Sequence, residues 1–192
     1  FFIYICVMEL QEVSLEKKIK QHNSITSWRY DFSACQLDIL FMLLANINDS
    51  DQDLKRYNIR VKDIELITGR SWNYQQVFDS NEDMLSRVFH IEESDGVRSI
   101  VLFSEVKYLK GTGSFDMVIN PSARNYFFEL KNNFTLLELK SVLGCTSKYA
   151  KRLYSLACQW RGTGGHTYSL GEFKGMLGLE DAKGKEVEQY KQ

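Results

Sequence analysis

The stretch SACQLDILFMLLANI, residues 33–47, decides the fold because it has the pattern of a buried helix. Ser33 and Gln36 form a capping box, the pair that starts a helix. Apolar residues then recur at helical spacing and cover nearly the whole circumference. A helix that is apolar on all sides packs in the centre of a domain. We therefore expect residues 33–47 to form the central helix of a hydrophobic core.

The segments that follow predict a winged helix-turn-helix. In order they are a strand at 57–60, a helix at 61–68, a helix at about 72–89, a hairpin of 88–91 with 97–103, a turn at 111–113, a strand at 115–119 and a helix at 121–130. Gly69 ends the first of these helices, and Asp95-Gly96 forms the hairpin turn. No single step is unique to the winged helix, but the order favours it.

The last third of the chain begins the same order again. Its expected elements are a helix capped by Thr135 and Glu138 that ends at Gly144, a helix at 148–161 capped by Ser147, a β-like pair at 167–168 and a helix at 170–177 capped by Ser169 and Glu172. Val61, Ile64, Thr68 and Gly69 match Leu170, Phe173, Leu177 and Gly178, each 109 positions later. We interpret this as an internal repeat.

The predicted fold class is therefore mainly α with small β-hairpins (α+β), built from two related winged-helix modules, the second incomplete. We expect an N-terminal arm at 1–23, a first module at 24–132 and a second at 133–192 that is truncated at its end. The apolar segment 1–7 precedes Met8, a plausible start, and we expect it to lie outside the fold.

Charge is spread unevenly over the 192 residues. The whole chain carries a net charge of −1, which excludes binding to nucleic acid by bulk charge. Residues 1–103 carry −5 and residues 104–192 carry +4, and six basic residues but one acid lie between 131 and 161. Lys148, Lys151 and Arg152 fall opposite the stripe of Tyr149, Leu153, Leu156 and Trp160 on a helical wheel. We expect these three cations on an exposed face, in contact with DNA phosphates, although a solvated helix face has the same pattern.

Catalytic and metal sites have weak support. Cys145 with His166 has the residue types of a nucleophile and base, residues 162–165 are glycine-rich, and Asp49, Asp51 and Asp53 alternate. None of these completes a known pattern, and the four cysteines and three histidines match no zinc spacing. We predict no enzyme activity, cofactor or metal. The absence of a long apolar segment and of a signal peptide predicts a cytoplasmic protein without membrane contact.

One segment resembles a known family. Residues 147–156, SKYAKRLYSL, resemble the signature S-x-Y-A-x-R-L-Y-E-L of RepA/RepE-type plasmid replication initiators, except that Ser155 replaces Glu. Residues 161–164, RGTG, and 170–179, LGEFKGMLGL, resemble the flanking motifs of that family. The resemblance implies tandem winged helices that bind repeated origin sequences (iterons) in double-stranded DNA. It also implies recruitment of the host initiator and helicase, and a homodimer through the first domain that represses its own gene.

In a winged helix one helix enters the major groove, and this predicts further DNA contacts. In the first module they are Arg70, Asn73, Gln75 and Gln76; in the second they are Lys183, Lys185, Gln189 and Lys191. Because this second helix is cut short, we expect weak binding to specific iterons. Two alternatives stay open: a winged-helix transcription regulator, and a dimerisation or interaction module that does not bind DNA.

Overall fold

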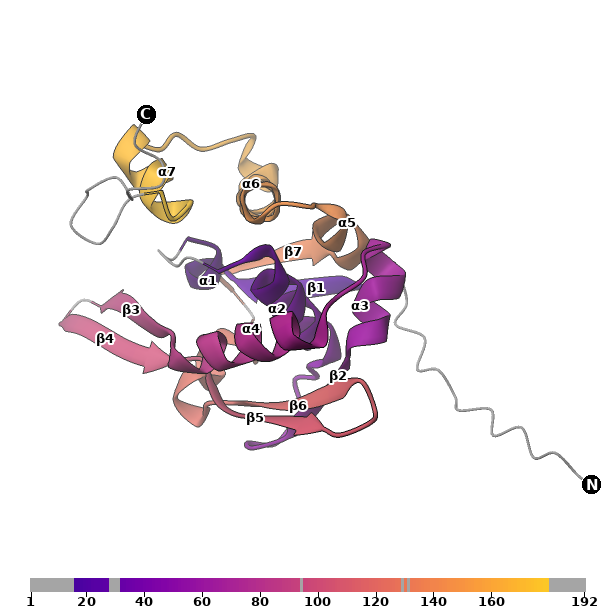
Figure 1. Ribbon diagram of the computed structural model, residues 1–192. Helices are drawn as coiled ribbons and strands as arrows, with labels where there is room; N and C mark the ends of the chain where they lie inside the picture. Colours follow the sequence, from indigo (N-terminus) through magenta and orange to yellow (C-terminus); the bar gives the residue numbers. More distant parts are fainter. Residues whose placement is uncertain (1–15, 28–31, 94, 129, 131, 180–192) are drawn as a thin grey trace, which may run out of the picture.

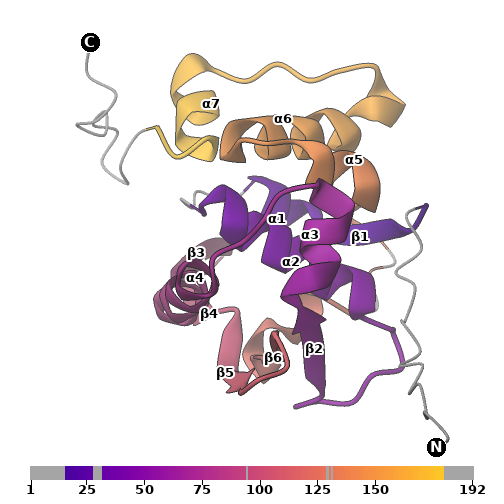
Figure 2. The ribbon, with the colours of Figure 1, turned by 45° about the vertical axis from the view of Figure 1, so that its right-hand side comes forward.

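The computed structural model describes residues 16–27, 32–93, 95–128, 130 and 132–179. The first module lies around a central helix, and the second packs across one side of it (Figures 1 and 2). The elements of the first module are β1 (Lys18–His22), α1 (Asn23–Ser27), α2 (Ala34–Asn46), β2 (Arg56–Arg60), α3 (Val61–Thr68), α4 (Tyr74–Ser86), β3 (Val88–Glu93), β4 (Gly96–Val101), β5 (Phe103–Leu109), β6 (Ser114–Ile119) and the 3₁₀ helix η1 (Pro121–Tyr126). The elements of the second module are β7 (Phe134–Glu138), α5 (Leu139–Gly144), α6 (Lys148–Gln159), the 3₁₀ helix η2 (Arg161–Thr163) and α7 (Leu170–Met176).

Helix α2 is the centre of the first module, as predicted. Its N-cap Ser33 accepts a hydrogen bond from the Gln36 N–H, and the Gln36 side chain accepts one from the Ser33 N–H. Residues 35–45 are all buried, so the helix is covered by neighbours on every side. This explains why its sequence is apolar nearly all round.

The first module is a winged helix with an inserted hairpin. Its sheet has the strand order β2-β6-β5 and is antiparallel throughout, with α3 and α4 between β2 and β5 in sequence. The wing is therefore the turn between β5 and β6 at residues 110–113. The predicted hairpin at Asp95-Gly96 is confirmed as β3–β4, but it is a separate two-stranded sheet inserted after α4. Strand β5 was not predicted.

Three local predictions in the rest of the chain are wrong. Thr135 and Glu138 form no capping box, because residues 134–138 form β7; the helix itself, α5, begins at Leu139 and ends at Gly144 as predicted. Residues 167–168 form no strand, and the helix after Pro121 is a short 3₁₀ turn that ends at Tyr126. The caps at Ser147 and Ser169 are confirmed.

The two modules meet at a two-stranded antiparallel ribbon. Strand β1 pairs antiparallel with β7, from Lys18 opposite Glu138 to His22 opposite Phe134. Residues 18–22, which we expected in an N-terminal arm, are thus a strand that joins the two modules. Helix α1 contacts α6 while α5 contacts α2, so the contacts between the two modules are reciprocal.

The internal repeat is confirmed by its matching helices. Helices α3 and α7 both end before a left-handed glycine, Gly69 with φ 67° and Gly178 with φ 72°. In each module a β-strand and a short helix precede a capped central helix, which is followed by α3 in one copy and α7 in the other. The second module has no strand equivalent to β2 among the residues described. The expectations about residues 1–7 and about the last helix of the second module lie outside the described part of the chain.

Candidate nucleic-acid interface

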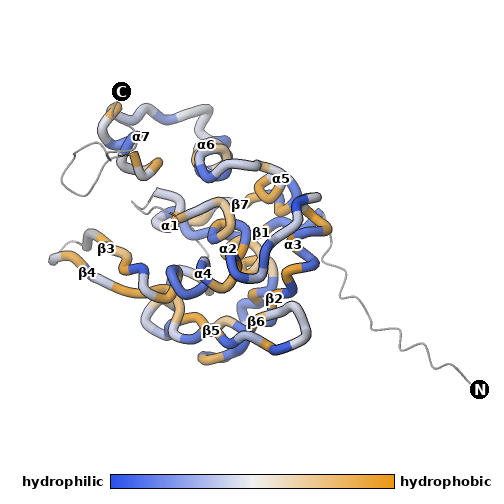
Figure 3. Tube along the Cα trace, viewed as in Figure 1, coloured by the Kyte–Doolittle hydropathy of each residue, from blue (hydrophilic) through white to orange (hydrophobic). Residues whose placement is uncertain are grey.

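The N-terminal turn of α4 presents amide side chains to solvent. Asn73 caps the helix, its side chain accepting a hydrogen bond from the Gln75 N–H at 2.8 Å. Gln75 and Gln76 follow in the first turn, and all three residues are exposed. The helix starts close to the position predicted from sequence, and its tube is largely hydrophilic in Figure 3. Asn and Gln are the side chains that pair with adenine in the major groove.

A groove of about 820 Å³ joins this turn to the second module. Three of the predicted contacts, Asn73, Gln75 and Gln76, line it together with Lys148 of α6. The structure thus brings together four predicted residues from positions that are about 75 apart in sequence.

The charge along this groove is balanced. Asp79 and Asp83 line it beside Arg87 and Lys148. Hydrogen bonds from Arg87 and Gln36 hold the pKa of Asp83 below its usual range, so this carboxylate stays ionised. Attraction of phosphate must therefore come from cations at the rim of the interface, because the acidic side chains on α4 oppose it.

The wing lies on the other flank of α4. Lys107 and Lys110 are exposed on β5 and its turn, and a second hollow is lined by Tyr74, Phe78, Tyr108 and residues 109–111, 113 and 114. The Tyr74 hydroxyl lies directly over Gly113, whose φ is 67°. Residues 111–113 were predicted only as a turn, and these two lysines were not among the predicted DNA contacts. Their signal was a basic residue immediately before a Gly-Thr-Gly turn in a winged-helix order.

The exposed basic face predicted for α6 is wrong for Lys151 and Arg152. Lys151 is fully buried and Arg152 is 5% exposed, while Leu153, on the opposite stripe, is 44% exposed. The Lys151 ammonium group forms an ion pair with Asp38 and donates to the carbonyls of Val142 at 2.9 Å and Leu143 at 3.2 Å. The polar side of α6 faces the first module because that module supplies a buried carboxylate. Among the three predicted cations, Lys148 alone lies at the groove.

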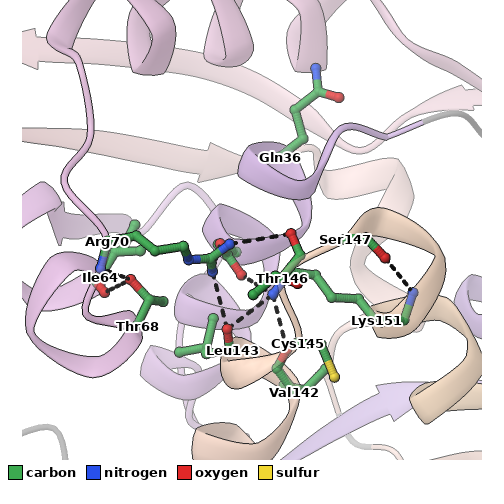
Figure 4. Close-up of polar contacts among 12 residues, drawn as sticks. Gln36, Ile64, Thr68, Arg70, Val142, Leu143, Cys145, Thr146, Ser147 and Lys151 are labelled. Atoms are coloured by element: carbon green, nitrogen blue, oxygen red, sulfur yellow. Dashed lines mark hydrogen bonds and ion pairs between the residues drawn. The ribbon is translucent and has the colours of Figure 1, made fainter.

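Arg70 also has structural partners. Its guanidinium donates to the Asp38 carboxylate at 2.9 Å and to the carbonyls of Leu143 at 3.1 Å and Thr146 at 3.4 Å (Figure 4). The pKa of Asp38 is raised by burial, which Lys151 and Arg70 oppose, and burial lowers the pKa of Lys151. These groups stabilise each other, and Arg70 does not point to a DNA ligand. Lys183, Lys185, Gln189 and Lys191 lie outside the described residues.

The catalytic alternatives gain no support from the geometry. His166 stacks on Trp160 with ring centroids 4.0 Å apart, and the Cys145 thiol lies 3.5 Å from the Ser141 carbonyl oxygen. Asp51 accepts hydrogen bonds from its own loop and from Tyr57. Within the described residues, no three His, Cys, Asp or Glu side chains are grouped as metal ligands, and no helix is long and apolar enough to cross a membrane.

Comparison with known proteins identifies relatives of this arrangement. The model of the family described as "Initiator Replication protein, WH1" matches residues 18–158. The crystal structure of the Pi initiator protein in complex with iteron DNA superposes with a TM-score of 0.74 and 16% sequence identity, covering 86% of this chain and 74% of that one. A WH1 domain of a replication protein isolated from a multiple sclerosis patient matches with a TM-score of 0.38 and 17% identity, over 53% of this chain and 84% of its own.

Proposed function

The chain belongs to the initiator replication protein family, and we propose that it starts plasmid replication by binding iterons in double-stranded DNA. The observation that carries this proposal is the exposed first turn of α4, with Lys148 on one flank and the wing lysines on the other. The structural likeness to Pi, which is seen bound to iteron DNA, supports the same interpretation.

The residues divide into two roles. Asn73, Gln75 and Gln76 carry both donors and acceptors, so they read base edges, and adenine is the base that they suit best. Lys148 and Lys110 hold the phosphates on either side and fix the register of α4 in the groove. This division requires binding alone, and no bond in the DNA is made or broken by the protein.

Both modules contact the DNA in this proposal. Helices α6 and α7 of the second module supply the start of a second helix-turn-helix, and the β1–β7 pairing joins that module to the first. The predicted contacts of the second module are Lys183, Lys185, Gln189 and Lys191, which extend the site beyond the part read by α4. Two modules in one chain bind one composite site, as a symmetric dimer of helix-turn-helix proteins binds two half-sites.

Footprinting on the DNA that flanks the gene of this protein identifies the site. The double variant Gln75→Ala/Gln76→Ala should lose discrimination between the footprinted duplex and the same duplex with its adenines replaced, at about 1–3 kcal/mol for each lost base contact. The matched variant Gln52→Ala, on an exposed loop at the far end of α2, should discriminate as the parent does. If the double variant keeps full discrimination, α4 does not read the bases.

Replication separates an initiator from a transcription regulator that binds similar DNA. A plasmid that carries the footprinted repeats and depends on this protein should replicate, and should fail with Gln75→Ala/Gln76→Ala. Recruitment of the host initiator and helicase to the origin should depend on the protein in the same way. Repression of a reporter without any origin activity would favour the regulator.

Self-association through the first module forms the second part of the proposal. The inserted β3–β4 hairpin exposes apolar side chains, with Val88 52% and Val97 65% accessible. Two-stranded sheets with open edges and apolar faces pair readily with another copy. Sedimentation of the parent should show a dimer that Val97→Lys weakens, whereas an unchanged equilibrium would assign dimerisation to another surface.

A further inference from the structure

Asp38 is a fully buried carboxylate between cations from two different segments. Arg70 binds one of its oxygens at 2.9 Å, and the Lys151 ammonium group forms an ion pair with the other. Asp38 belongs to the central helix α2 and Arg70 to the turn between α3 and α4, while Lys151 comes from α6. One carboxylate thus links the central helix and the helix-turn-helix of the first module to the second module.

The two cations also bind the end of α5. Lys151 donates to the carbonyls of Val142 and Leu143 in the last turn of that helix, where positive charge is favourable. Arg70 donates to the same Leu143 carbonyl and reaches Thr146 in the turn before α6 (Figure 4). The α5–α6 corner is therefore held directly by Arg70, the second residue after α3 and three positions before Asn73.

The second module repeats this arrangement with a different side chain. Asp38 lies five positions after the cap Ser33, and Arg152 lies five positions after the equivalent cap Ser147. Arg152 is buried and its guanidinium donates to the Met176 carbonyl at the end of α7. In both copies a buried charge on the central helix binds at the end of the next helix: Arg152 binds the last residue of α7, and Asp38 binds Arg70, two residues after α3.

Stability alone explains such a cluster poorly. Asp38 and Lys151 are fully buried and Arg70 is partly buried; moving charges out of water is costly, and apolar residues of similar volume often stabilise a core as well or better. Charged groups define a relative orientation, because a planar guanidinium and a carboxylate bind in few geometries. An apolar contact between two helices allows the helices to shift along each other.

We propose that Arg70, Asp38 and Lys151 are positioning residues that fix the orientation of α4 relative to the second module, and so set the spacing between the two parts of the DNA site. This inference rests on the proposed function for its DNA consequence. Its geometric part, a fixed orientation between α4 and α7, holds with or without DNA.

The geometric part is tested by the distance between spin labels at Glu82→Cys on α4 and Leu170→Cys on α7. Both positions are exposed, and the other accessible cysteines are replaced by serine. Double electron–electron resonance on the DNA-free protein should give a single, narrow distribution of distances between the two labels. Arg70→Gln should broaden or shift it, because the links to Asp38, Leu143 and Thr146 are lost together. An unchanged distribution would overturn the proposal.

Two further variants separate positioning from general stability. Arg56→Gln breaks an exposed Arg–Glu pair across β2 and β5, far from the module junction, and should leave the distance unchanged. Arg70→Lys keeps a charge beside Asp38 but loses the planar fork, so it should fold and broaden the distribution less than Arg70→Gln. Should Arg70→Gln fail to fold, the Arg70→Lys distance decides: an unchanged one overturns the proposal.

The DNA part is tested with the footprinted duplex and with duplexes carrying one or two extra base pairs between the regions protected by each module. The parent should lose affinity about tenfold or more for each added pair, since each rotates one region relative to the other. Arg70→Gln should lose less than about threefold on the same duplexes, although its affinity for the original site is lower. Equal losses in both proteins would overturn the spacing role. A parent that binds no duplex would instead contradict the proposed function and leave the spin-label result to decide the orientation.

Discussion

At the scale of single residues, buried carboxylates hold loops and turns in place by gathering donors. Asp51, in the loop after α2, accepts hydrogen bonds from the Lys55 ammonium group at 2.7 Å, the Tyr57 hydroxyl at 2.9 Å and the Asn48 N–H at 2.9 Å. Arg124 of η1 binds the same loop through the Asp51 carbonyl. One side chain therefore closes the connection between the central helix and the sheet.

The pH dependence of folding should report on Asp51. Burial by itself would raise the pKa of this carboxyl, but its hydrogen bonds prevail and lower the pKa below the ordinary value. A lowered folded pKa gives stability that is present above the unfolded pKa of about 3.9 and is lost as the pH falls. Urea melts of Asp51→Asn should show a smaller loss of stability than the parent between about pH 5 and pH 3. Parallel pH profiles would show that Asp51 does not have this role.

Gly113 is a residue-scale constraint on the wing. Its φ of 67° and the Tyr74 hydroxyl above it leave no room for a side chain. Gly113→Ala should therefore destabilise the protein by about 1 kcal/mol or more. Gly171→Ala in α7, where a Cβ meets nothing, should instead stabilise by about 0.5–1 kcal/mol. Thermal melts measure the stability change of each variant. Changes of the same sign in the two variants would contradict this description of the wing.

At the scale of elements, the burial of a helix that is apolar on all sides was predictable, whereas the buried face of a helix with one apolar and one polar side was not. Helix α2 was predicted with its cap and its burial because an all-apolar helix has only one stable place. Helix α6 was predicted with its cap, but Lys151 and Arg152 were wrongly expected on an exposed face, whereas both are buried. Its pattern distinguishes two faces, and the assumption that the apolar face is buried fails because Asp38, 113 positions earlier, draws Lys151 inward. Such a partner is invisible to a local pattern.

Substitution at the central helix tests the core of the first module. Leu40 is completely buried on α2, so Leu40→Ala should cost about 2–5 kcal/mol of unfolding free energy. The same substitution at Leu66 of α3, which is 67% exposed, should change stability by less than about 0.5 kcal/mol. Denaturant melts give both values. A loss below about 1 kcal/mol at Leu40 would place α2 at the periphery.

At the scale of the whole molecule, a winged-helix module and the described part of a second, related module share one continuous structure. The internal repeat was legible because matching caps and glycines recur at 114 and 109 positions. The β1–β7 ribbon could not be predicted, because strands of five residues have too short a hydrophobic pattern and their paired residues are about 116 positions apart in sequence. Of the candidate DNA contacts, the amide residues of α4 and Lys148 meet at one groove, whereas Arg70 and Lys151 join the modules and Arg152 binds the end of α7. A sequence pattern identifies charged residues, but it does not show whether they contact DNA or hold the two modules together.

We propose that the flanks of α4 hold DNA phosphates. The salt dependence of binding to the footprinted duplex tests this claim most directly. The logarithm of affinity should fall steeply with the logarithm of salt concentration for the parent, and Lys148→Ala and Lys110→Ala should each flatten the slope by about one. Lys140→Ala, an exposed lysine on α5 outside the groove and the wing, should leave the slope as it is. A parent slope near zero, or slopes that do not change in the Lys148 and Lys110 variants, would contradict the account.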